Sequence, residues 1–148
     1  MEKLLNEDVS NQVKDVLSEM MQSPVRVLFF SGKENCEYCD QTRQLLEEID
    51  SLNAGLNLEN FDIVLDAEAA TKHNVSEVPA IVIAGLENEQ LIDYGIRFLG
   101  IPAGHEFTSL INSIIMVSRR EAGLNPSTKE FLAKLDKEIL LRVFVTPT

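Results

Sequence analysis

Residues 25–39, VRVLFFSGKENCEYC, decide the fold of this chain. The segment opens with residues 25–30, a short run of β-branched and aromatic side chains that is almost wholly apolar and therefore typical of a strand buried on both faces. A polar loop follows over residues 31–35, and the apolar positions beyond it predict a helix over about residues 36–52. A buried strand that leads into a helix favours a sheet covered by helices.

Cys36 and Cys39 are the only cysteines of the sequence, and they form a Cys-Glu-Tyr-Cys motif where the predicted strand meets the predicted helix. Helical spacing turns both sulfurs to one side, close enough to form a disulfide, and the unpaired N–H groups of the helix N-terminus favour a thiolate. Within a βαβ unit this motif indicates redox chemistry, with Cys36, nearer the helix end, as the attacking sulfur.

Two other interpretations of the cysteines stay open. They could be buried thiols without a role, or half of a zinc site that a second chain completes with its own CxxC pair. His73 and His105 have no ligand spacing relative to the cysteines, so we expect both at the surface or at helix ends and predict no metal site within one chain.

The segment Val75-Ser-Glu-Val-Pro-Ala80 carries a second signal, because Pro79 stands directly before an apolar run that predicts a strand. An X-Pro bond in such a loop is often cis. A proline also commonly opens a strand, so both interpretations of Pro79 are open.

The remaining pattern alternates helices and strands. Helices are predicted over about residues 3–21, 36–52, 68–73, 104–121 and 127–135, and strands over residues 25–30, 61–65, 80–84, 91–99 and 139–145. Residues 85–89 are expected to form a hairpin turn, and the spacing of Ser127 and Glu130 predicts a capping box that opens the last helix. This order places parallel strands, joined by a helix, beside an antiparallel hairpin in an α/β fold.

Composition and charge exclude several functional classes. The 148 residues are 45% apolar and 25% charged, which is ordinary for a folded domain. The net charge of −11 repels nucleic acid and anionic membrane surfaces, so neither is an expected partner. The first eight residues have the pattern of neither a signal nor a transit peptide, and no apolar stretch is long enough to span a bilayer. We therefore expect a cytoplasmic protein.

Taken together, the strand, the CxxC, the Val-Pro loop, the hairpin and the final helix resemble the thioredoxin superfamily over residues 24–121. A closer resemblance, to the glutaredoxin-like protein disulfide oxidoreductases of thermophilic archaea and bacteria, rests on GKENCEYCDQ (32–41), YGIRFLGIPAGHEF (94–107) and VFVTPT (143–148). The resemblance implies a three-layer thioredoxin-like fold with a central mixed four-stranded sheet flanked by helices.

In that family two thioredoxin-fold units follow one another, each with its own CxxC. The resemblance therefore implies one unit over residues 1–123 and, over residues 124–148, an extra helix and strand like the start of a second unit. The apolar strand at 139–145 could fold back onto its own domain or pair with the same strand of another chain. We expect the second arrangement, a homodimer.

For the site, the resemblance implies that Cys36 is the nucleophile, Cys39 the resolving thiol and Pro79 a cis proline packed against the disulfide. The backbone of Val78 would pair with an extended substrate peptide, and Tyr38 would also contact the substrate. The motif departs from thioredoxin and most glutaredoxins in its Glu-Tyr pair, and no aspartate occupies the preceding strand.

The sequence thus supports two functions. The leading one is a thiol–disulfide oxidoreductase that needs no cofactor, acts on disulfide-containing proteins and takes electrons from a donor such as a thioredoxin-reductase-like flavoprotein. The alternative is a noncatalytic thioredoxin-fold binding module, with an acidic docking surface and a structural CxxC.

Overall fold

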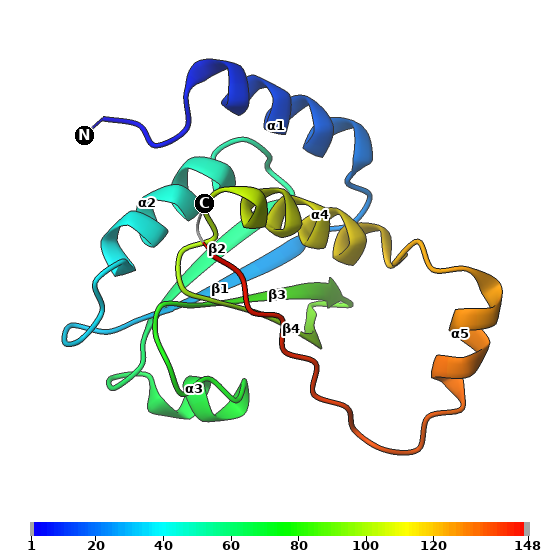
Figure 1. Cartoon of the computed structure of the whole chain (residues 1–148). Helices are drawn as coiled ribbons and strands as arrows, with labels where there is room; N and C mark the ends of the chain where they lie inside the picture. Colours follow the sequence, from blue (N-terminus) through cyan, green and yellow to red (C-terminus); the bar gives the residue numbers. More distant parts are fainter. Residues whose placement is uncertain (1, 147–148) are drawn as a thin grey trace.

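The computed structural model describes residues 2–146 (Figure 1). Its elements are, in order, α1 (Glu7–Met20), β1 (Val25–Ser31), α2 (Cys39–Asp50), β2 (Leu56–Asp62), α3 (Ala67–Lys72), β3 (Ala80–Glu87), β4 (Gln90–Leu99), α4 (His105–Arg119) and α5 (Pro126–Ala133). All five predicted helices form, although most are shorter than expected. None of the helices described is both long and apolar enough to cross a membrane.

The four strands form one mixed sheet in the order β2-β1-β3-β4. β1 runs parallel to β2 and antiparallel to β3, and β3 runs antiparallel to β4. The two central strands are the most apolar ones, because a strand with neighbours on both sides and helices on both faces meets no water. The predicted mixed four-stranded sheet is confirmed.

Helices cover both faces of the sheet and make the three layers of a thioredoxin-like fold. Alternate residues of β1 face opposite layers: Val27 and Phe29 pack with α1, α2 and α4, whereas Leu28 and Phe30 pack with α3. Figure 1 shows the same division, with α3 alone on its side of the sheet. The C-terminal end of β1 therefore lies between two packed layers, and the chain leaves it toward the cysteines.

The prediction for β2 was wrong in position. We expected the strand at residues 61–65, but it occupies Leu56–Asp62 and ends in a tight turn. The turn is closed by the Asp62 side chain, whose Oδ1 accepts hydrogen bonds from the backbone N–H groups of Val64 (2.9 Å) and Leu65 (3.0 Å). As an edge strand, β2 (LNLENFD) mixes apolar and polar residues, and this pattern is weaker than the mostly apolar run of β1.

The cap of α5 also differs from the prediction. The helix begins at Pro126 and is capped by Asn125, whose side chain accepts a hydrogen bond from Thr128 N at 2.8 Å. The expected capping box of Ser127 and Glu130 does not open it. Proline at the first helical position has no N–H to satisfy, and the cap at Asn125 lies two residues before the Ser127 that the Ser-Glu spacing suggests.

The predicted strand at residues 139–145 is not formed in the described part of the chain. A strand needs a hydrogen-bonding neighbour, and the segment joins neither edge of the sheet. Its apolar side chains are exposed, from 56% at Val145 to 90% at Phe144. In Figure 1 this red segment returns from α5 across the view without entering the sheet. Pro147 and Thr148, the end of the segment compared with the oxidoreductase family, lie outside the described residues.

Candidate active site

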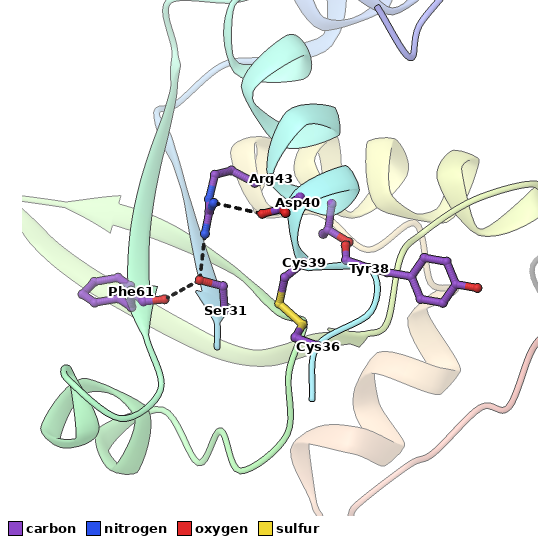
Figure 2. The surroundings of a disulfide bond; sticks show 8 residues. Ser31, Cys36, Tyr38, Cys39, Asp40, Arg43 and Phe61 are labelled. Atoms are coloured by element: carbon purple, nitrogen blue, oxygen red, sulfur yellow. Dashed lines mark hydrogen bonds and ion pairs between the residues drawn. A yellow bond between two sulfur atoms is a disulfide. The ribbon is translucent and has the colours of Figure 1, made fainter. Parts of the chain in front are cut away.

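The two cysteines lie where the chain passes from β1 into α2, and they are joined by a disulfide (Figure 2). Their Cα atoms are 5.4 Å apart. The helix begins at Cys39 rather than at Cys36 as predicted, because residues 37–38 form a turn. The carbonyl of Tyr38 accepts hydrogen bonds from the backbone N–H (2.9 Å) and the Oγ1–H (2.7 Å) of Thr42, which fixes the first turn of α2.

The two sulfur-bearing residues differ in accessibility. Cys39 is 4% exposed and belongs to the core between α2 and the sheet. Cys36 is half-buried and lies in the loop ahead of the helix. A partner that approaches from outside therefore reaches Cys36 first.

Tyr38 extends outward from the turn between the cysteines. Its side chain is 46% exposed, and Figure 2 shows the ring pointing away from the disulfide. The ring therefore adds an aromatic surface to the outside of the motif rather than packing beneath the sulfurs.

The loop before β3 carries the second feature that the sequence singles out. The Val78–Pro79 peptide bond is cis, as one of the two open interpretations predicts. A Cβ placed on Gly32 would lie 3.3 Å from Cγ2 of Val78, so this loop packs against the segment that leads into the CxxC. Gly100 N donates to the carbonyl of Pro79 at 2.9 Å, whereas no described residue hydrogen-bonds to the backbone N–H or C=O of Val78.

A groove of about 690 Å³ runs beside the disulfide and is lined by both cysteines. It also carries charges of both signs, from Lys33, Asp40, Arg43, Asp62 and Asp66. Hydrogen bonds from the backbone N–H groups of Leu65 and Val64 hold the pKa of Asp62 below its usual value. Within residues 2–146, no group of three or more histidine, cysteine or acidic side chains is placed to hold a metal ion.

Arg43 also lines this groove, and the CxxC motif did not predict it as a residue of the site. Its Nη2 donates to Ser31 Oγ at 2.9 Å, and its guanidinium carbon lies 5.8 Å from the centre of the Phe29 ring. A signal for it does exist in the sequence, because Arg43 follows Cys39 by four residues and so shares its helix face. The spacing alone does not say that the side chain would turn inward to the end of β1.

A second polar cluster joins α3 to β4. His73 Nδ1 lies 2.8 Å from Asp93 Oδ2, and Arg97 donates to both oxygens of the same carboxylate at 2.7 and 2.9 Å. His73 lies at the end of α3, as expected, but it is buried rather than at the surface, whereas His105 is exposed at the start of α4. Burial raises the pKa of Asp93, but hydrogen bonds from Arg97, His73 and Gly95 outweigh it and hold that pKa well below its usual value.

The sheet order, the CxxC at the start of α2 and the cis proline before β3 together define a thioredoxin-fold redox protein. No protein-family model matches the chain. The chain is related to the protein disulfide oxidoreductase of Aeropyrum pernix, with 30% identity and a TM-score of 0.75 over 90% of this chain and 57% of that one. This agrees with the resemblance noted from the sequence.

A second relationship is to the alkyl hydroperoxide reductase component AhpF. The Staphylococcus aureus protein is 26% identical over 145 residues, which is 98% of this chain. The N-terminal domain of AhpF from Enterococcus faecalis has the same fold, with a TM-score of 0.77 at 22% identity over 90% of this chain and 62% of that one. The chain spans a quarter of the length of the curated relatives it matches.

Proposed function

We propose that this protein is a thiol–disulfide oxidoreductase that acts on protein disulfides through Cys36 and Cys39. The observation that carries the proposal is the disulfide at the start of α2, with Cys36 half-buried and Cys39 buried beside the loop of the cis Val78–Pro79 bond. A dithiol in this position has one sulfur that a substrate can reach and a second that is held next to it.

The reaction follows from that asymmetry. The thiolate of Cys36 attacks a substrate disulfide, forms a mixed disulfide and releases one substrate thiolate. Cys39 then attacks the Cys36 sulfur, so that the Cys36–Cys39 bond forms and the second substrate thiolate leaves. Two electrons pass from the dithiol to the substrate, and the exchange requires no cofactor in this chain.

The loop before β3, which contains Val78 and Pro79, is proposed as the platform on which the substrate peptide binds. The backbone groups of Val78 are free of partners among the described residues, so an extended peptide can add to them as a short strand. Pro79 has no N–H to compete for that pairing, and we assign it to the contact with the disulfide. Tyr38 contributes an exposed ring at the outer side of the same site.

The electron donor is proposed to be a reductase, in keeping with the thioredoxin-reductase-like flavoprotein expected from the sequence. The match of nearly the whole chain to one quarter of an alkyl hydroperoxide reductase component supports a reductase as the redox partner. The direction of electron flow depends on the reduction potential of the dithiol relative to its donor.

Reduction of insulin disulfides by dithiothreitol tests the proposal. We expect the wild-type chain to accelerate the reaction and Cys36→Ser to lose the acceleration. Cys39→Ser is the matched variant, because it retains the attacking sulfur and is expected to accumulate a mixed disulfide with the substrate. If Cys36→Ser retained the wild-type rate, the noncatalytic binding module would be the better account of the chain.

A further inference from the structure

Arg43 brings a fixed positive charge to the groove that holds the dithiol. The side chain starts one helical turn after Cys39, is 39% exposed and lines the same groove as both cysteines. The hydrogen bond to Ser31 Oγ and the contact with the Phe29 ring hold its guanidinium at the C-terminal end of β1, beside which the disulfide lies (Figure 2). Ser31 is itself held, because its Oγ–H donates to the carbonyl of Phe61 at 3.3 Å.

The charge of Arg43 has no buried counter-charge among the described residues. Its one acidic contact there is Asp40 at 3.4 Å, and the Asp40 side chain is 95% exposed, so solvent screens this pair. Asp62 accepts hydrogen bonds from backbone N–H groups of its own turn, and Asp66 accepts one from Asp62 N at 2.7 Å. The other charged groups around the cysteines are exposed, and they are Lys33, Glu34 and Glu37.

The strand ahead of the motif, β1, contains no acidic side chain that could act on the cysteines. β1 reads VRVLFFS, and Ser31 is its only buried polar side chain near the cysteines. Cys39 must nevertheless lose a proton before it can attack the mixed disulfide, and its burial disfavours the charged thiolate. A cation held in the same groove offsets that cost.

We propose that Arg43 is a further residue of the reaction, which stabilises the thiolate of Cys39 electrostatically and so promotes resolution of the mixed disulfide. This inference rests on the proposed function. In the step concerned, the Cys39 thiol gives its proton to solvent, its sulfur bonds to the Cys36 sulfur, and the bond from Cys36 to the substrate breaks. The substrate sulfur leaves as a thiolate with the electron pair of that bond.

The aromatic disulfide dithiobis(nitrobenzoic acid) separates the two steps in a stopped-flow experiment. Attack by Cys36 releases one coloured thiolate, and attack by Cys39 on the resulting mixed disulfide releases the second. In Arg43→Gln we expect the second release to slow about tenfold at neutral pH and to reach the wild-type rate at alkaline pH, where Cys39 is ionised in both proteins. A purely structural role of Arg43 would not produce this shift of the pH profile.

The reduction potential gives an independent measurement of the same effect. Because Arg43 stabilises the reduced, thiolate form, Arg43→Gln should shift the equilibrium with glutathione about tenfold toward the oxidised protein, or about 30 mV for a two-electron couple. Arg43→Lys, which retains the charge, should recover most of the change. Ser31→Ala removes the hydrogen bond that holds the guanidinium, so it should change the rate of the second release and the reduction potential in the same direction as Arg43→Gln, but by less. It is the variant to measure if Arg43→Gln does not fold.

Arg26→Gln is the matched control, because Arg26 lies at the other end of β1 and pairs with Glu59. The inference is wrong if Arg43→Gln keeps the wild-type pH profile and potential, or if Arg26→Gln changes them equally. If the wild-type chain reduces insulin disulfides, either result would contradict only the role of Arg43 and not the proposed oxidoreductase function. A wild-type chain that releases no second thiolate would instead overturn the proposed function.

Discussion

Glu37 follows Cys36, whose sulfur is proposed to attack the substrate, and it places a negative charge in the exposed turn ahead of α2. A carboxylate in this position opposes the helix N-terminus, because it disfavours a second negative charge on Cys36. Its exposure to solvent screens the effect but does not remove it. We therefore expect the potential of the dithiol to depend on a balance between the negative charge of Glu37 and the positive charge of Arg43 proposed above.

Replacing Glu37 with proline should make the protein a stronger oxidant. Loss of the charge stabilises the thiolate form, and proline is tolerated because the backbone N–H of Glu37 donates to no described residue. We expect a less negative potential in equilibration with glutathione. Glu37→Gln is the control that removes the charge without a ring, and it should account for most of the change. An unchanged or more negative potential in both variants would contradict an electrostatic role for Glu37.

At the scale of elements, the cluster of His73, Asp93 and Arg97 fixes the end of α3 against β4. Arg97 also donates to the carbonyl of His73 at 2.7 and 3.1 Å, so one side chain binds both the carboxylate and the helix end. The pairing of β3 and β4 shifts register between Ile83 and Ala84, which places two additional residues in β4 after Asp93. The loop to Pro79 begins directly after His73, so this cluster anchors one end of the proposed substrate platform.

Asp93→Asn should lower the free energy of unfolding by about 2 kcal/mol at neutral pH, because Arg97 and His73 lose a charged partner. The folded-state pKa of Asp93 is depressed, so its stabilising contribution is complete above the unfolded value of 3.8 and is lost progressively as the pH falls from that value toward the lower folded-state pKa, with part of it lost near pH 3. Urea unfolding of both proteins at neutral pH and near pH 3 measures the difference.

Asp15, one of the exposed acids of α1, supplies the control for that comparison. Asp15→Asn removes a carboxylate without an ion-pair partner among the described residues, and it should change the free energy of unfolding little at either pH. A wild-type advantage over Asp93→Asn that is as large near pH 3 as at neutral pH would show that the cluster does not act through the charge of Asp93.

At the scale of the whole molecule, residues 1–123 are proposed as one thioredoxin-fold unit and residues 124–148 as an extension like the start of a second one. α5 has no buried residue, and the apolar side chains that follow it are exposed. Six of these side chains lie between residues 139 and 145, namely Ile139, Leu140, Leu141, Val143, Phe144 and Val145. An apolar segment outside the sheet favours pairing with another chain.

We expect the intact chain to form a dimer through residues 139–145, and a truncation that ends at Leu135 to be monomeric. The net charge of −11 on each chain opposes association, so the dimer should tighten as salt screens the repulsion. Sedimentation velocity over a range of protein and salt concentrations measures both effects. An intact chain that stays monomeric at high protein and high salt concentration would contradict the pairing.

Much of the fold could be predicted because its signals are local. The mostly apolar run of β1 indicates a strand buried on both faces, and the CxxC that follows it marks where the chain turns into α2. The edge strand β2 was predicted in the wrong place because it mixes polar with apolar residues, so its pattern competes with the apolar residues Val64 and Leu65 in the next turn. For the two cysteines and for Pro79 the residue types left more than one interpretation open, and the structure has the disulfide and the cis bond.

The sequence by itself determined the alternation of helices and strands and the position of the dithiol, since periodicity and neighbouring residues are sufficient for these, and the resemblance to the oxidoreductase family implied the three layers and the mixed four-stranded sheet. Only the tertiary structure decided that Arg43 reaches Ser31, that His73 is buried against Asp93, and that residues 139–145 lie outside the sheet. Each of these depends on a partner from a different element, or on the lack of a neighbouring strand among the described residues. Side-chain direction and strand pairing are settled by packing between distant segments, which local patterns do not encode.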